Sequence, residues 1–195
     1  MYMKLLDNLK ILQKAGIFTT SDIKRYLGLS QDALRKLIWR YQKHGVLVKL
    51  RNGLYTLRGG GEPDSFLLAN KLYQPSYVSF ETALSFYGII PETVYSVTSA
   101  TAKLTRNISS LGREFSYRKI KRKAYGGFKP VKIGGNTVLM AEPEKAFADR
   151  LYFEFLKKTG PLDRVNARKL NKAIIVKYIK LFGNEKFLKW SKNAF

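Results

Sequence analysis

The chain has 195 residues, of which 36 are Lys or Arg and 14 are Asp or Glu, so its formal net charge is 36 − 14 = +22 at pH 7. Such a charge attracts polyanions, while 45% hydrophobic residues indicate a folded protein rather than a basic disordered tail. Cysteine is absent and His44 is the one histidine, which excludes disulfides, thiolate metal sites and imidazole zinc sites. No apolar run approaches the roughly 20 residues that cross a bilayer, and the first residues lack a signal-peptide pattern. We therefore expect a cytoplasmic protein without a membrane partner.

Residues 1–60 predict three short helices followed by a hairpin. Leu5, Leu9 and Leu12 recur at helical spacing and indicate the first helix. Thr19 or Thr20 caps the second helix, and a glycine at position 28 supplies the turn after it. The buried face of this second helix is predicted to hold Ile23, Tyr26 and Leu27.

The third predicted helix, Gln31–His44, follows a Ser30 cap and combines an apolar stripe with a basic outer face. The apolar residues fall at i, i+3, i+4 and i+7: Leu34, Leu37, Ile38 and Tyr41. The opposite side presents five polar or basic residues: Gln31, Arg35, Lys36, Arg40 and Lys43. Trp39 shares that outer side, where we expect it to dock against the second domain or another subunit, or to pack against DNA. His44 is expected to interact with the helix dipole, without a catalytic role.

Strand-like runs at 46–50 and 54–57 follow, joined by Arg51-Asn52-Gly53, and Asn-Gly is a strong hairpin signal. Helix, turn, helix and then a basic hairpin is the order of a winged helix-turn-helix, whose third helix enters the major groove. We expect four residues to read base edges: Gln31, Arg35, Lys36 and Arg40. Four others are expected to position the DNA backbone: Lys43, Lys49, Arg51 and Asn52. The alternative is that this basic face is an ordinary solvated helix surface.

Gly59-Gly60-Gly61-Glu62-Pro63 cannot continue a helix or a strand, so it predicts a linker, about 59–63, between two domains. The winged helix-turn-helix would occupy residues 1–58 and the second domain residues 64–195. In the second domain, helices are predicted at 66–73, 80–87, 143–156, 170–182 and 185–190. Strands are predicted at 77–79, 94–99, 115–120, 131–133 and 137–140. Strands grouped between helices indicate an α+β domain, and hence an α+β protein.

Three segments of the second domain resemble a known family. They are Tyr77-Val78-Ser79-Phe80-Glu81-Thr82-Ala83-Leu84-Ser85-Phe86-Tyr87-Gly88, Val97-Thr98-Ser99 and Ala141-Glu142-Pro143-Glu144-Lys145-Ala146. With the N-terminal winged helix, they are similar to the AbiEi antitoxins of AbiE-type (type IV) bacterial toxin–antitoxin pairs. The resemblance implies a repressor that binds inverted repeats in its own operon and counteracts a nucleotidyltransferase-like toxin, directly or indirectly. It carries no catalytic residue over to this chain.

Residues Arg113–Lys132 hold eight basic side chains and one acid, interleaved with Tyr117, Tyr125 and Phe128. Such a mixture grips a phosphate backbone while aromatic rings stack or pack. The alternative is a solvated strand face whose aromatic residues point into the core. We expect a secondary basic strip here that extends the DNA footprint or meets RNA or an acidic partner: Arg118, Lys119, Lys121, Arg122 and Lys123.

Glu142-Pro143-Glu144-Lys145 offers the residue types of a metal-dependent nuclease. Acids at the start of a helix, however, complement its dipole, and a nucleophile would lack partners because the one histidine lies in the predicted DNA-reading helix. We therefore expect no enzyme, no cofactor and no metal. Besides a sequence-specific repressor, two readings stay open: an RNA-binding or toxin-docking protein, and a basic DNA binder without sequence preference.

Overall fold

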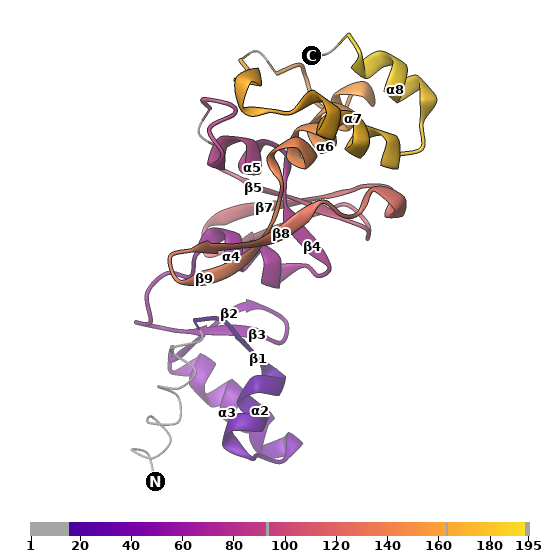
Figure 1. The fold of residues 1–195 in the computed structure, drawn as a ribbon. Helices are drawn as coiled ribbons and strands as arrows, with labels where there is room; N and C mark the ends of the chain where they lie inside the picture. The colour runs from indigo at the N-terminus through magenta and orange to yellow at the C-terminus, as the bar shows by residue number, and fades with distance from the viewer. Residues whose placement is uncertain (1–15, 93, 163, 194–195) are drawn as a thin grey trace. The chain divides into compact units, whose positions relative to one another are not determined.

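The computed structural model describes residues 16–92, 94–162 and 164–193. In this described part the chain is mixed α+β, with seven α-helices and two β-sheets, which confirms the predicted fold class (Figure 1). The chain divides into two compact units, the first ending at Asp64 and the second beginning at Ser65. The helix predicted from Leu5, Leu9 and Leu12 lies outside the described residues.

The first unit pairs two helices with a small antiparallel sheet of order β1-β3-β2. Its elements are β1 (Phe18–Thr19), α2 (Thr20–Leu27), α3 (Gln31–Lys43), β2 (Leu47–Arg51) and β3 (Leu54–Leu57). The turn between β2 and β3 is fastened to the start of α2, because the Thr20 N–H donates to the Gly53 carbonyl at 3.1 Å. The start of α2 is therefore tied to the hairpin by the backbone itself.

Both helices begin at the predicted caps. The Thr19 hydroxyl accepts from the Asp22 N–H at 3.1 Å, and the Asp22 carboxylate accepts from the Thr19 N–H at 2.8 Å, which completes a capping box. Ser30 accepts from the Ala33 N–H and caps α3 in the same way. Between the helices, Gly28 has a φ of +60°, a left-handed conformation that favours glycine. The predicted turn is thus confirmed.

The first unit has one hydrophobic core, and the whole apolar stripe predicted for α3 contributes to it. Its buried members are Phe18, Ile23, Leu34, Leu37, Ile38, Tyr41, Leu47 and Tyr55, with Leu27 partly buried against them. The prediction that Tyr26 is buried was wrong, since its side chain is 52% exposed. On so short a helix the buried face centres on Ile23 and Leu27, one turn apart. Tyr26 falls to the side, beneath the Arg25 guanidinium.

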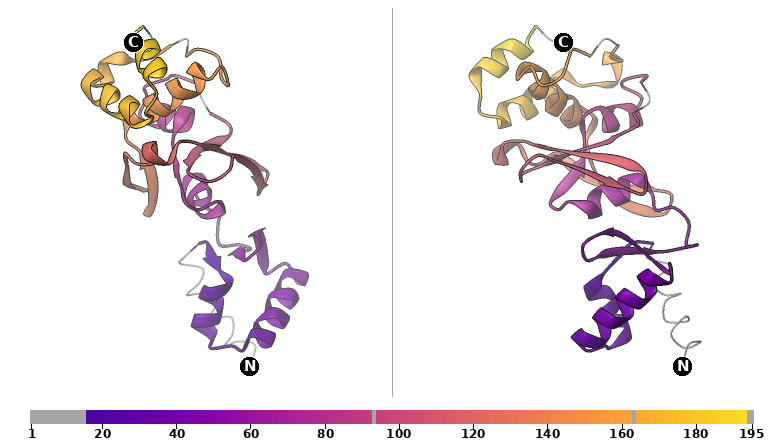
Figure 2. Two further views of the ribbon diagram at one scale, coloured as in Figure 1. Left: turned by 90° about the vertical axis from the view of Figure 1, so that its right-hand side faces the viewer. Right: turned by 180° about the vertical axis from the view of Figure 1, so that it is seen from behind.

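The second unit is built on a six-stranded mixed sheet of order β6-β7-β5-β4-β9-β8. Its elements are α4 (Ser65–Leu72), β4 (Ser76–Val78), α5 (Phe80–Phe86), β5 (Val97–Thr101), β6 (Arg106–Ser110), β7 (Arg113–Lys119), the short 3₁₀ turn η1 (Arg122–Ala124), β8 (Phe128–Ile133), β9 (Asn136–Ala141), α6 (Pro143–Phe155), a second 3₁₀ turn η2 (Ala167–Lys169), α7 (Lys172–Leu181) and α8 (Glu185–Ser191). The pairs β5–β7 and β4–β9 are parallel and the others are antiparallel. Helix α4 packs on one face of the sheet, whereas α5 and α6 cover the other with α7 and α8 outside them (Figures 1 and 2).

Helix α6 is fixed to the sheet by a fully buried polar cluster. The Asp149 carboxylate pairs with the Lys145 ammonium one turn earlier and accepts from the Tyr77 hydroxyl at 3.1 Å and from Ser79 Oγ at 2.8 Å. Desolvation raises the pKa of Asp149 and lowers that of Lys145. Because Tyr77 lies in β4 and Ser79 follows it, the cluster joins a helix and a strand that are about seventy residues apart in sequence.

Two features of the sheet differ from the prediction. The strand expected at 94–99 begins only at Val97 and runs to Thr101. Strand β6 was not predicted, because its sequence Arg-Asn-Ile-Ser-Ser has one apolar residue and its outer edge is exposed, so it shows no strand periodicity. The remaining predicted elements of the second unit are present, with ends shifted by a few residues.

Candidate nucleic-acid interface

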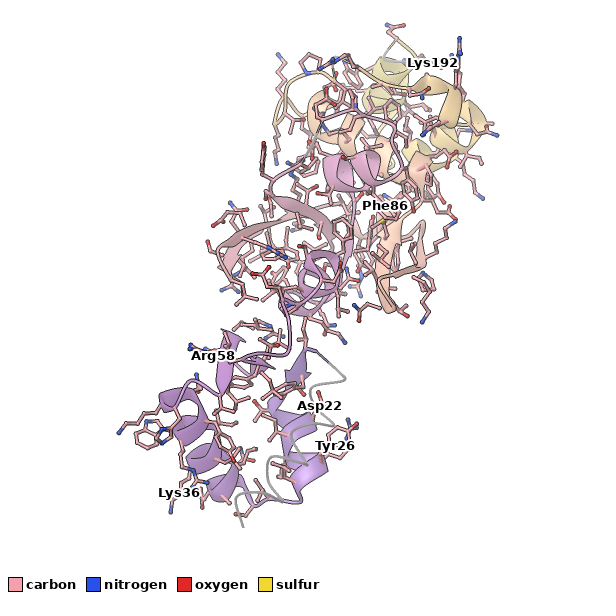
Figure 3. The ribbon with its side chains drawn as sticks, turned by 90° about the vertical axis from the view of Figure 1, so that its left-hand side faces the viewer. Asp22, Tyr26, Lys36, Arg58, Phe86 and Lys192 are labelled. Atoms are coloured by element: carbon pink, nitrogen blue, oxygen red, sulfur yellow. The ribbon has the colours of Figure 1, made fainter. Side chains whose placement is uncertain are left out.

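The solvent-facing side of α3 carries all five residues predicted for it. Gln31, Arg35, Lys36, Arg40 and Lys43 are each exposed, opposite the buried stripe of the same helix. In Figure 3, Lys36 points away from α2 and into solvent. One acid shares this side: Asp32 lies 4.0 Å from Arg35, and both side chains are more than 70% exposed, so this ion pair contributes little to stability. Within the described residues of the first unit, this face is basic and solvent-exposed.

Trp39 lies at the centre of this face. Counted at 100° per residue, it falls almost opposite the buried Leu34 and Tyr41. Its side chain is 64% exposed, and the Lys43 ammonium sits 5.1 Å from its ring centroid. An indole this exposed is uncommon on a protein surface.

The hairpin presents its predicted basic residues to solvent as well. Lys49, Arg51 and Asn52 are all exposed, whereas Leu50 between them is buried. The β2–β3 register slips by one residue between Lys49 and Arg51, a bulge that aims both side chains outward. Arg58, which no sequence pattern indicated, follows β3, is exposed and lies against Gly45 at the end of α3.

The secondary strip divides into one residue with a structural partner and four that are exposed. Arg118 donates to both Glu81 carboxylate oxygens, at 2.9 and 3.1 Å, and its guanidinium lies 4.9 Å from the Phe80 ring centroid. Arg118 is therefore held within the fold by Glu81, a carboxylate that it shares with Arg150 at 2.8 Å. The other four residues are exposed: Lys119, Lys121, Arg122 and Lys123. Tyr117 is fully buried, as the alternative interpretation expected.

The sheet brings two further basic residues to this strip. Strands β5 and β7 run parallel and β6 runs antiparallel to β7, so the ends of β5 and β7 and the start of β6 meet at one end. Lys103 and Arg106 lie there, both within 6 Å of the Tyr73 ring centroid, and the Lys119 N–H donates to Thr105 Oγ1. We call this group the basic sheet end: Lys103, Arg106, Lys119, Lys121, Arg122 and Lys123. The sequence could not show it, because strand order is not readable from periodicity.

The carboxylates at the start of α6 have structural partners. Glu142 accepts from the Tyr178 hydroxyl at 2.5 Å, and Glu144 accepts from the Asn171 N–H at 3.2 Å. Lys145 points away from them into the buried cluster with Asp149. Helix α6 starts at Pro143, as predicted, so the acids lie at its positive end. Across the residues that the structure describes, no group of three or more His, Cys, Asp or Glu side chains is arranged to hold a metal ion.

None of the described helices combines the length and apolar character needed to cross a bilayer. Comparison of the chain with protein-family models finds no match, and comparison with curated proteins finds no similar sequence.

Proposed function

We propose that the chain is a sequence-specific DNA-binding repressor whose first unit is a winged helix-turn-helix, with α3 as recognition helix and the β2–β3 hairpin as wing. The observation that carries this proposal is the outer face of α3. Four cations lie outside the buried stripe of this helix with Gln31 beside them, and all five side chains are exposed. A helix of this kind fits the major groove, where arginine and lysine recognise guanine and glutamine recognises adenine.

The roles follow from position on the unit. Gln31, Arg35, Lys36 and Arg40 are proposed to read base edges. Lys43 lies in the last turn of α3 and Lys49, Arg51 and Asn52 lie on the hairpin, so they are proposed to hold the backbone. Because these contacts add a salt-dependent, sequence-independent affinity, the ratio of specific to non-specific binding is the quantity that distinguishes a repressor.

The wider proposal is that the repressor is an antitoxin of the AbiE type. It rests on the short motifs of the second unit together with the proposed winged helix, and it proposes inverted repeats in its own operon and a nucleotidyltransferase-like toxin as partners. Co-expression with the gene beside its own tests this part. Growth arrest that this chain relieves supports an antitoxin, and arrest that it leaves unchanged contradicts one.

Enrichment of bound duplexes from a random-sequence pool tests the DNA-binding proposal. We expect an inverted repeat to emerge with the full chain and to disappear in a variant with Arg35, Lys36 and Arg40 changed to Gln. The matched control changes three exposed lysines of the α8 region to Gln: Lys186, Lys189 and Lys192. This control removes the same charge and should retain the enriched sequence. If no sequence is enriched, the result favours a basic DNA binder without sequence preference. If the chain prefers structured RNA to duplex DNA, the result favours the RNA-binding alternative.

A further inference from the structure

The second unit holds an open cavity of about 570 Å³ between α4 and the sheet. One side of it is a single stripe at i, i+3, i+4 and i+7 that runs from α4 into the loop after it: Leu67, Asn70, Lys71 and Gln74. The other walls come from Ser76 at the start of β4, from β9 and from the rings of Tyr125 and Phe128. We call it the strand-gap cavity.

The cavity exists because β4 and β9 separate. Within these two described strands, one position is paired, Val78 with Met140. Asn70 replaces the absent strand at Leu139: its Oδ1 accepts from the Leu139 N–H at 2.5 Å, and its Nδ2 donates to the Leu139 carbonyl at 3.2 Å. A side chain thus satisfies the backbone groups that a strand would otherwise cover, and the space beside them stays open.

One polar group in the wall has no partner. Ser76 is 3% exposed and lines the cavity, yet its Oγ makes no hydrogen bond to any residue that the structure describes. A buried hydroxyl without a partner costs free energy, so this part of the wall is not fully satisfied within the fold. Flat aromatic and aliphatic surface surrounds it, since Phe128 and Tyr125 pack in one aromatic cluster and Leu139 is 38% exposed.

Positive charge adjoins the cavity on several sides, and none of its lining residues is acidic. Lys121, Arg122 and Lys123 immediately precede Tyr125, which lines it, and all three are exposed. Lys71 is itself a lining residue, and Lys132 pairs in register with Thr137, which also lines the cavity. A ligand with a flat polar ring and a phosphate beside it matches both the aromatic cavity and the cations that adjoin it.

We propose that the strand-gap cavity binds a nucleobase of a single-stranded nucleic acid whose phosphates lie along the basic sheet end. The ring would lie against Tyr125, Phe128 and Leu139, with Ser76 in the wall of the site. A paired base in a duplex cannot enter without leaving its stack, so this site selects single strands, unlike the α3 face. An acidic protein would use the cations but not the aromatic cavity.

Binding of a fluorescently labelled oligothymidylate of about ten nucleotides to the full chain tests the site, with an abasic strand of equal length as the reference. Base stacking makes the oligothymidylate bind about tenfold more tightly or better. Leu139→Glu, which places a carboxylate in the cavity wall, abolishes that advantage. Leu156→Glu is the matched control, because Leu156 is 37% exposed at the end of α6, and it should leave the advantage intact. Oligouridylate run in parallel shows whether RNA or DNA is the preferred source.

Changing Lys121, Arg122 and Lys123 to Gln should weaken both strands, and the α8 control of Lys186, Lys189 and Lys192 should not. Equal affinity for the oligothymidylate and the abasic strand would overturn the proposal, as would a Leu139→Glu variant that keeps the advantage. Loss of single-strand binding on changing Arg35, Lys36 and Arg40 would also overturn it, because the binding would then belong to the first unit. Duplex binding by Leu139→Glu is measured alongside, so failure of this site and failure of the DNA-reading proposal are told apart.

Discussion

At the scale of single residues, Arg35 is the most direct test of base reading by α3. Its guanidinium is exposed and its ion pair with Asp32 is long, so removing it changes recognition without disturbing the fold. We expect Arg35→Ala to weaken binding to the preferred duplex by about 1–3 kcal/mol while scrambled duplex is less affected. Titration of both duplexes by fluorescence anisotropy measures this, with Lys189→Ala as the control. Equal losses on the two duplexes would assign Arg35 to a phosphate.

Asp149 is the residue on which the second unit depends most. It is fully buried and compensates Lys145 while accepting from Tyr77 and Ser79. Asp149→Asn leaves the Lys145 charge buried without its counterion, so we expect the free energy of unfolding to fall by about 3–5 kcal/mol. Urea unfolding followed by circular dichroism measures it. Glu185→Gln, an exposed acid at the start of α8, is the control, and a loss for Asp149→Asn as small as that of the control would contradict the account.

At the scale of elements, the start of α2 depends on its cap. Thr19 makes three hydrogen bonds with Asp22, between 2.7 and 3.1 Å, so Thr19→Ala should destabilise the first unit by about 1 kcal/mol. Ser30 makes a single, exposed cap bond of 3.3 Å at α3, so Ser30→Ala should cost less. Thermal unfolding of the two variants gives the comparison. A Ser30→Ala loss equal to or larger than that of Thr19→Ala would show that the capping box does not hold the helix.

Elements were predictable from the sequence where their boundaries and buried face depend only on neighbouring residues. The stripe from Leu34 to Tyr41, both caps and the α6 start at Pro143 follow from spacing and backbone preference, and the structure agrees. Strand β6 was not predicted, because its sequence has no alternating apolar pattern and the strand forms by pairing with β7. Arg118 and Glu81 are 37 residues apart in the sequence, so no local pattern predicts their ion pair.

The candidate sites differ in the same way. The exposed face of α3 lies on one helix, so its five residues could be chosen from the sequence. The basic sheet end and the strand-gap cavity require strand order and the gap between β4 and β9, which depend on the whole sheet. Lys103 and Arg106 could therefore be recognised only with the fold in hand.

At the scale of the whole molecule, the burial of tyrosine hydroxyls lowers the free energy of unfolding at alkaline pH. Desolvation raises the pKa of five tyrosines in the described part: Tyr77, Tyr87, Tyr125, Tyr152 and Tyr178. The folded state then keeps protons that the unfolded state releases above about pH 10, so stability falls as the pH rises beyond that value.

Tyr178, which also donates to Glu142, isolates this effect. We expect the free energy of unfolding of the wild type to fall more steeply between pH 9 and pH 11 than that of Tyr178→Phe, because the folded state holds the Tyr178 proton that the unfolded chain releases. Urea unfolding across this range measures both slopes, and identical slopes would contradict the assignment.

A net charge of +22 favours binding to any polyanion, so affinity alone does not test the central claim. The decisive measurement is binding of the full chain to the duplex upstream of its own gene and to a scrambled duplex, across a salt series. The account predicts a preference of about 10³ or more for the upstream duplex that persists at physiological salt. Equal affinities that fall together as salt rises would contradict a sequence-specific repressor.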